Sequence, residues 1–252
     1  MGRSLLALAS LVGAAGLAAA FAPSTAVGRA VVDRPAEGWI RVKPTSTKRP
    51  LPANVIAQVR PGSALALYDR PFGRVVTRVG SITRFGSQRA FGVVTTHRGR
   101  WLAVTEAGVA GNRVVWLDAR SRGLRFARTR YRVEVDLSNR TLLVRRDGVV
   151  ARHLSIAIGR SESPTPTGRF AVTDKLAGSN FSASYGCCIL ALSAIQPNLP
   201  AGWTGGNRIA IHGTLSPDFG QAASAGCMHA RDTDLRYLMR LLPLGTPVVI
   251  RP

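Results

Sequence analysis

The sequence predicts a mainly β fold in two parts: a β-sandwich or barrel with one or two short helices, preceded by a small β-barrel. Two observations predict it. From Asn54 onward, short apolar runs alternate with turns that carry Gly, Asp or Asn, which is typical of strands. One stretch, residues 232–242, has Leu and Met at helical spacing instead. The chain of 252 residues is long enough for one large domain or two smaller ones.

The first residues are typical of an export signal. Arg3 supplies a positive start, and Leu5 to Ala22 is rich in Leu, Ala, Val and Gly. We expect a signal peptide over residues 1–26, which is either cleaved or kept as a membrane anchor, and a linker with few apolar positions over residues 27–53. The remainder is then expected outside the cytoplasmic membrane, in the cell wall or periplasm.

The charge balance points to an anionic partner. The chain has 34 Lys and Arg against 13 Asp and Glu, a net charge of +21. Its arginines are scattered singly along strands and turns, whereas a nucleic-acid protein would cluster them with aromatic residues. No nucleic acid is therefore expected, and with an export signal the favoured polyanions are cell-wall polymers, attracted without specificity.

Three cysteines, Cys187, Cys188 and Cys227, leave at least one thiol unpaired. This count excludes the disulfide framework of small secreted proteins. Adjacent cysteines rarely bond each other because the ring is strained, so we expect Cys187 and Cys188 to pack as buried thiols. A disulfide from either of them to Cys227 is a second hypothesis, and it would block the third thiol.

The first predicted domain, residues 54–126, contains short strands with Gly-bearing turns. Within it, Trp101-Leu102-Ala103-Val104 precedes a second tryptophan strand, Val114-Val115-Trp116-Leu117. This pattern resembles a bacterial src-homology-3-like (SH3-like) domain. Both tryptophans are expected in its core, because large aromatic side chains dominate burial in small barrels.

The second predicted domain, residues 127–252, opens with three strands that begin at Tyr131. Asp147-Gly148 between two of them is a strong hairpin signal. Gly168 permits a tight turn before a strand over residues 169–173. Near the end, Asp232 is expected to cap the predicted helix, Pro243 to stop it, and residues 246–250 to form the last strand.

The residues that carry chemistry lie between positions 209 and 232. RIAIHG reads as a strand that ends at His212, and Ser224-Ala225-Gly226 places three small residues before the Cys227 thiol. Backbone amides in such a turn can approach a bound carbonyl and form an oxyanion hole. A nearby imidazole lowers the pKa of a thiol and can act as base and then as acid. Simple packing of His212 and Cys227 is one alternative. The other is a zinc site, for which His229 adds only a third ligand and no Cys-x-x-Cys pair is present.

A series of motifs, in order, resembles the L,D-transpeptidase family with its YkuD-like catalytic domain. The motifs are the opening strand with Val-Asp-Leu-Ser, Asp147-Gly148, the strand ending in Gly159, Thr165-Pro166-Thr167-Gly168-Arg169-Phe170, Ile211-His212-Gly213-Thr214, Ser224-x-Gly226-Cys227 and the closing Leu-Gly-Thr-Pro-Val. The resemblance implies a Cys227 nucleophile with His212 as its base, oriented by the Gly213 carbonyl. It implies an oxyanion hole of the Ala225, Gly226 and Cys227 amides. On the substrate side it implies Ser224, His229 and Tyr185.

The resemblance also implies a reaction. Cys227 would form a thioester with a peptidoglycan tetrapeptide stem, and an amine of a neighbouring stem would resolve it to a 3→3 cross-link. No metal or organic cofactor is implied, and carbapenems are expected to acylate the same sulfur. Two departures matter, because Ala225 replaces the usual His and His229 the usual Arg or Asn. Resolution by water, which is an L,D-carboxypeptidase reaction, and a catalytically weakened wall-binding protein are the alternatives.

Overall fold

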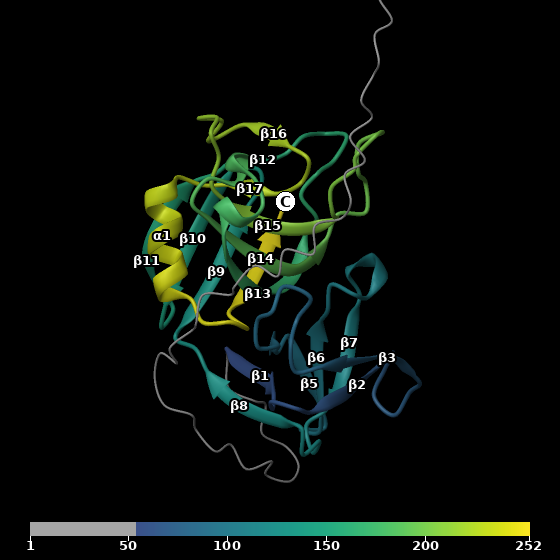
Figure 1. The fold of residues 1–252 in the computed structure, drawn as a ribbon. Coiled ribbons are helices and arrows are strands. Elements are labelled where there is room, and N and C mark those ends of the chain that lie inside the picture. The colour runs from purple at the N-terminus through teal and green to yellow at the C-terminus, as the bar shows by residue number, and fades with distance from the viewer. Residues whose placement is uncertain (1–53) are drawn as a thin grey trace, which may run out of the picture.

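The computed structural model describes residues 54–252, so the predicted signal peptide and linker lie outside the described residues. The described chain is mainly β, as predicted, with strands β1 to β18 and one α-helix. Figure 1 shows its two parts stacked, with β1 to β8 on one side and the larger sheet with the helix on the other. Over residues 54–252, none of the helices has the length and apolar character needed to cross a bilayer.

Strands β1 to β8 form two small sheets with strand orders β4-β1-β8 and β3-β2-β7-β6-β5. Trp101 is buried as expected, with 3% exposure, whereas Trp116 is only partly buried. Assignment of this part to the SH3-like class stays a prediction. The strand bounds are β1 Val55–Val59, β2 Ala64–Tyr68, β3 Val75–Gly80, β4 Ala90–Gly92, β5 Thr95–His97, β6 Trp101–Thr105, β7 Val114–Asp118 and β8 Leu124–Arg128.

The second part is built on an eight-stranded sheet with the order β11-β10-β9-β18-β13-β14-β15-β17. The predicted hairpin is confirmed: Asp147 and Gly148 have φ of 52° and 86°, which a two-residue type I′ turn requires. The bounds are β9 Tyr131–Asp136, β10 Thr141–Arg146, β11 Val149–Ser155, β13 Gly168–Ala177, β14 Cys188–Ile195, β15 Arg208–His212, β17 Met228–His229 and β18 Pro247–Arg251. A separate parallel pair consists of β12 (Ile158–Gly159) and β16 (Ala222–Ser224).

Helix α1 (Asp232–Leu241) forms where the periodicity predicts it and packs Leu235 and Leu238 into the main core. The predicted cap is wrong. Arg231 occupies the cap position without a side-chain hydrogen bond, and Asp232 is the first helical residue. Its carboxylate instead accepts a hydrogen bond from the amide of Cys187 at 3.0 Å, because the loop before β14 packs against the start of the helix. The described part of the chain also has three short 3-10 helices: η1 Ala110–Asn112, η2 Gly178–Asn180 and η3 Ala183–Tyr185.

Each part has a hydrophobic cluster of its own, and the two parts also pack against each other; the predicted boundary at residue 126 stays a prediction. Ile56 of β1 and Ala90 of β4 belong to the same hydrophobic cluster as the eight-stranded sheet and α1. Strand β8 continues to Arg128, two residues beyond the predicted boundary. The first part is therefore positioned directly against the strands that carry the site.

Candidate active site

The pairing of β15 with β17 brings the candidate nucleophile and base together. The two strands are parallel, with Ile211 opposite Met228 and His212 opposite His229. Cys227 immediately precedes β17. Because side chains alternate between the two faces along a strand, Cys227, His229 and His212 project to the same side of the sheet. Residues 15 positions apart in the chain thereby line one pocket.

His212 is buried, with 6% exposure, and held in one tautomer. Its Nδ1 lies 2.6 Å from the carbonyl oxygen of Gly213, the contact expected of that glycine. Since a carbonyl can only accept, Nδ1 carries the proton and Nε2 remains as an acceptor. Burial, aided by the neighbouring His229, lowers the pKa of His212 to about 4. The imidazole is therefore neutral at physiological pH.

Cys227 is the free cysteine of the three, and it is partly buried. Its Sγ lies 3.8 Å from the carbonyl oxygen of Arg208, toward which the thiol donates. Burial raises the pKa of the Cys227 thiol to about 11. The sequence argument predicted the opposite direction. The reason is that the imidazole is itself buried and neutral, so it supplies no positive charge to stabilise a thiolate.

The turn that carries Cys227 is fixed by two polar side chains. The hydroxyl of Ser224 donates to the Cys227 carbonyl at 2.5 Å and accepts from the Gly226 amide at 3.0 Å. Gln196, just after β14, donates its amide to the carbonyl of Ala225 at 3.2 Å and to two carbonyls of the loop before β13. The Gly226 amide is thus engaged by Ser224. Of the three expected oxyanion donors, this leaves the Ala225 and Cys227 amides for a substrate oxygen.

A second histidine stands beside the first. The rings of His212 and His229 have centroids 4.7 Å apart, and Nδ1 of His229 lies 2.7 Å from Oδ2 of Asp218. The ring of Tyr185 also meets the His212 ring edge to face, with the centroids 4.7 Å apart. His229 and Tyr185 were predicted from the sequence, whereas Asp218 was not.

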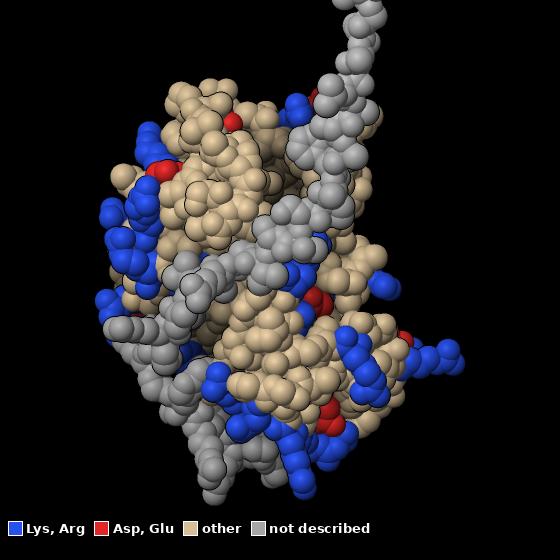
Figure 2. All heavy atoms as spheres, in the orientation of Figure 1, with Lys and Arg blue, Asp and Glu red and all other residues tan. Residues whose placement is uncertain are grey.

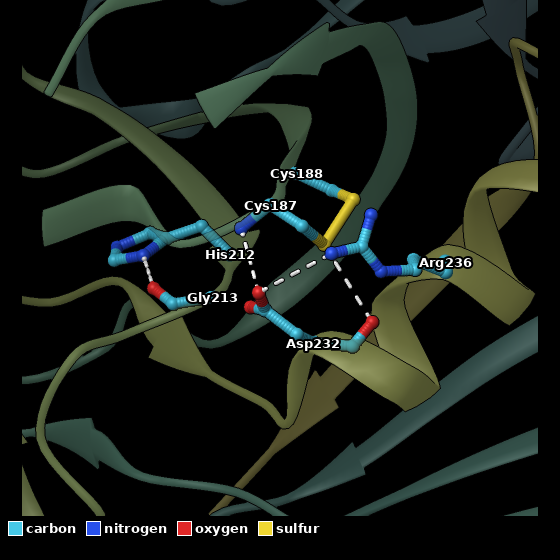
Figure 3. Close-up of a disulfide and its surroundings, with 6 residues drawn as sticks. All are labelled: Cys187, Cys188, His212, Gly213, Asp232 and Arg236. Atoms are coloured by element: carbon cyan, nitrogen blue, oxygen red, sulfur yellow. Dashed lines mark hydrogen bonds and ion pairs between the residues drawn. A yellow bond between two sulfur atoms is a disulfide. The ribbon is translucent and has the colours of Figure 1, made fainter. Parts of the chain in front are cut away.

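Cys187 and Cys188 form a disulfide with each other, which corrects the expectation of two packed thiols. The turn at Gly186, with φ of 56°, and the contact of the Cys187 amide with Asp232 hold the pair at the start of β14, whose first residue is Cys188. Figure 3 shows the disulfide beside His212, Gly213 and Asp232, and the Gly213 amide donates to the Cys188 carbonyl at 3.2 Å. The pair therefore supports the segment that holds the base and does not engage Cys227.

The predicted residues converge on one pocket of about 400 Å³. Its lining includes Cys227, His212, His229, Tyr185, Ser224 and Ala225. Gly213 lies beside it and holds the His212 ring through its carbonyl. Among residues 54–252, no group of three or more His, Cys, Asp or Glu side chains is placed to hold a metal ion.

The sequence of residues 130–250 matches the model of the YkuD family, described as the L,D-transpeptidase catalytic domain. These residues belong to the L,D-transpeptidase family. The L,D-transpeptidase domain includes β9 to β17, α1 and nearly all of β18, and it contains every residue of the pocket. Strands β1 to β8 lie outside it.

Two curated relatives of the L,D-transpeptidase domain are the YkuD proteins of Bacillus licheniformis and Bacillus subtilis. The first is 33% identical over 124 residues and the second 29% identical over 121 residues. Each match covers 48% of this chain. The first covers 66% of the B. licheniformis protein and the second 65% of the B. subtilis protein. The matches thus span just under two thirds of the relatives' length.

Similar solved structures include Bd1075 from Bdellovibrio bacteriovorus, which is 25% identical with a TM-score of 0.40 and covers 49% of this chain and 48% of that chain. An Enterococcus faecium L,D-transpeptidase, solved as a Cys-to-Ser mutant, is 24% identical with a TM-score of 0.37, covering 48% and 49%. The catalytic domain of the E. faecium L,D-transpeptidase acylated by ertapenem is 25% identical with a TM-score of 0.35, covering 50% and 99%.

Asp218 and Gln196 are the two site residues that sequence reasoning missed. Asp218 lies 11 positions before its partner His229 in a loop, and no spacing rule connects them. Gln196 directly follows the fully buried strand β14. A polar residue at the end of this apolar run was the signal in the sequence that could have identified it. Both act through contacts that exist only once the loops have folded.

Proposed function

We propose that this protein is an exported peptidoglycan L,D-transpeptidase that forms 3→3 cross-links through a thioester on Cys227. The observation that carries the proposal is the neutral imidazole of His212, with Nε2 as an acceptor, in the same pocket as the one free thiol among the described residues. Membership of the L,D-transpeptidase family supports the substrate class, a peptidoglycan stem peptide.

The first half of the reaction is acylation of the sulfur. Sγ of Cys227 attacks the carbonyl that joins the third stem residue to the terminal D-Ala, while Nε2 of His212 takes the thiol proton. Because burial raises the pKa of the thiol and lowers that of the imidazole, the proton moves as the carbon–sulfur bond forms, and no thiolate is stored beforehand. The amides of Ala225 and Cys227 stabilise the oxyanion. His212 then protonates the departing D-Ala nitrogen as the carbon–nitrogen bond breaks.

The second half resolves the thioester. An amine on the third residue of a neighbouring stem attacks the acyl carbon, an amide bond forms, and Cys227 is released as a thiol. Water in place of the amine yields the L,D-carboxypeptidase product. Incubation of the purified protein with disaccharide-tetrapeptide separates the two outcomes, because transfer produces cross-linked dimers and hydrolysis produces only tripeptide.

A carbapenem tests the nucleophile directly. We expect one covalent adduct by intact-mass spectrometry in the unaltered protein and none in Cys227→Ala. His212→Gln is expected to acylate at least ~100-fold more slowly, since a positioned general base contributes about that much or more. Circular dichroism of each variant serves as the folding control. An adduct that persists in Cys227→Ala contradicts the proposal, and a folded protein with no adduct favours the weakened wall-binding alternative.

Export and attraction to anionic wall polymers also remain parts of the proposal. Figure 2 shows Lys and Arg side chains along the side of the molecule formed by α1 and β11, where Arg152, Arg236 and Arg240 are exposed. Acidic side chains are sparse in this view. Such an unbalanced surface supports non-specific attraction to a polyanion. Export rests on the sequence of residues 1–26, which lie outside the described residues.

A further inference from the structure

The imidazole of His229 has an acidic partner, and that of His212 does not. Nδ1 of His229 contacts the carboxylate of Asp218 at 2.7 Å, whereas Nδ1 of His212 contacts the neutral Gly213 carbonyl at 2.6 Å. An ionised carboxylate can only accept a hydrogen bond, so Nδ1 of His229 carries the ring proton. Nε2 of His229 is then free to accept a proton. Two differently supported imidazoles thus lie with centroids 4.7 Å apart in one pocket.

The pair of His229 and Asp218 is held in place by backbone hydrogen bonds of His229 and by the burial of both side chains. The backbone of His229 exchanges two hydrogen bonds with Ala157, at 3.0 and 3.1 Å. The side chains of His229 and Asp218 are each only 14% exposed. Within residues 54–252, the second carboxylate oxygen of Asp218 is buried and has no hydrogen-bond partner. The Asp218 carboxylate therefore has the His229 imidazole as its hydrogen-bond partner and is largely shielded from solvent.

This geometry suits a proton acceptor. A carboxylate on Nδ1 fixes the tautomer, orients the ring and compensates the positive charge that forms when Nε2 takes a proton. His212 lacks such a partner, is buried, and has its ring in contact with the rings of Tyr185 and His229. His229 is the more accessible of the two imidazoles, so an acceptor that enters from solvent meets it first.

We propose that His229, held by Asp218, is a second proton acceptor that serves the deacylation half of the reaction. The inference rests on the proposed thioester mechanism. As the acceptor nitrogen or water oxygen bonds to the acyl carbon, its proton passes to Nε2 of His229 and the carbon–sulfur bond breaks. The sulfur leaves as a thiolate, and the proton on His229 then passes to it. The products are an amide or acid and the free thiol, and both imidazoles end neutral.

An activated ester allows acylation and deacylation of Cys227 to be measured separately. p-Nitrophenyl acetate acylates the thiol and releases p-nitrophenolate, whose colour reports acylation. After rapid desalting, loss of the acetyl group from the protein by intact mass reports deacylation. We expect His229→Gln to slow deacylation at least ~10-fold, in line with the contribution of a general base, and to slow acylation much less. Asp218→Asn should act in the same direction with a smaller effect.

A structural role of His229 would give a different pattern. Exogenous imidazole should restore deacylation in His229→Gly, because a free base can enter the space of the lost ring, and a packing defect would not respond. The matched control is His153→Gln, an exposed histidine of β11, which should leave both rates unchanged. Equal slowing of both halves, or unaltered deacylation in His229→Gln, overturns this inference alone. Failure of the unaltered protein to acylate on Cys227 overturns the proposed function as well.

Discussion

The imidazole of His212 is both the proposed base and a buried group that resists protonation. Its ring loses hydration in the core and gains only a neutral carbonyl as partner, so its pKa is lowered to about 4. A base with this pKa does not hold a proton between steps, which suits transfer to the D-Ala nitrogen. The same burial couples the stability of the protein to pH.

This coupling predicts an acid-sensitive contribution to folding. An unfolded histidine binds a proton below its ordinary pKa of about 6.5, whereas folded His212 does so only near pH 4. His212 therefore contributes about 3 kcal/mol to the free energy of unfolding above pH 6.5, and this contribution should be lost as the pH drops from there to about 4. Urea titrations from pH 7.5 to 4 test this. His212→Gln should show a smaller decline, and parallel curves for both proteins contradict the assignment.

The turn between β16 and β17 positions the nucleophile through backbone geometry. Gly226 has a φ of +116°, a conformation that side-chain-bearing residues rarely adopt. A Cβ at this position would lie 2.1 Å from Nε2 of Gln196, the side chain that ties the turn to β14. The turn, the Gln196 contacts and the Ser224 hydroxyl thus form one support for Cys227.

Gly226→Ala should disturb both stability and acylation. Forcing a Cβ into this space strains the backbone and displaces Gln196, at a cost of about 1–3 kcal/mol in the free energy of unfolding. Carbapenem adduct formation should slow at the same time, because the sulfur and its neighbouring amides shift together. Gly80→Ala in β3 is the control, since a Cβ there meets no atom within 4 Å. A Gly226→Ala protein with unaltered stability and acylation rate would show that the turn adapts.

The contact between the two parts of the molecule reaches toward the pocket. Phe85, from the first part, belongs to the same apolar cluster as Tyr185 and Cys227, and the guanidinium of Arg208 lies over its ring. Thr83 donates to the buried carboxylate of Asp174 in β13. The loop between β3 and β4, which carries Thr83 and Phe85, therefore packs against the L,D-transpeptidase domain next to Tyr185 and Cys227.

Asn112 tests whether the two parts unfold together. Its side chain exchanges two hydrogen bonds with the backbone of Ile195 at the end of β14, at 2.7 and 2.8 Å. Asn112→Ala leaves these buried groups without partners and should lower the free energy of unfolding by about 1–3 kcal/mol. A single shared transition in the variant, by tryptophan fluorescence and by circular dichroism, indicates one cooperative unit. Asn180→Ala, at an exposed position, is the control and should change little. Two separate transitions would contradict joint unfolding of the two parts.

Local patterns in the sequence were sufficient for the strands, the Asp147-Gly148 hairpin, the helix at residues 232–242 and the candidacy of Cys227 and His212. Each depends on alternation, turn chemistry or a motif, and these are short-range properties of the chain. Other features depend on tertiary contacts. They are the hydrogen bond between the Asp232 carboxylate and the Cys187 amide, the contact of Asp218 with His229, the Cys187–Cys188 disulfide, and the directions in which the pKa values of His212 and Cys227 shift. Desolvation and partners from distant loops exist only after folding, so no local pattern encodes them.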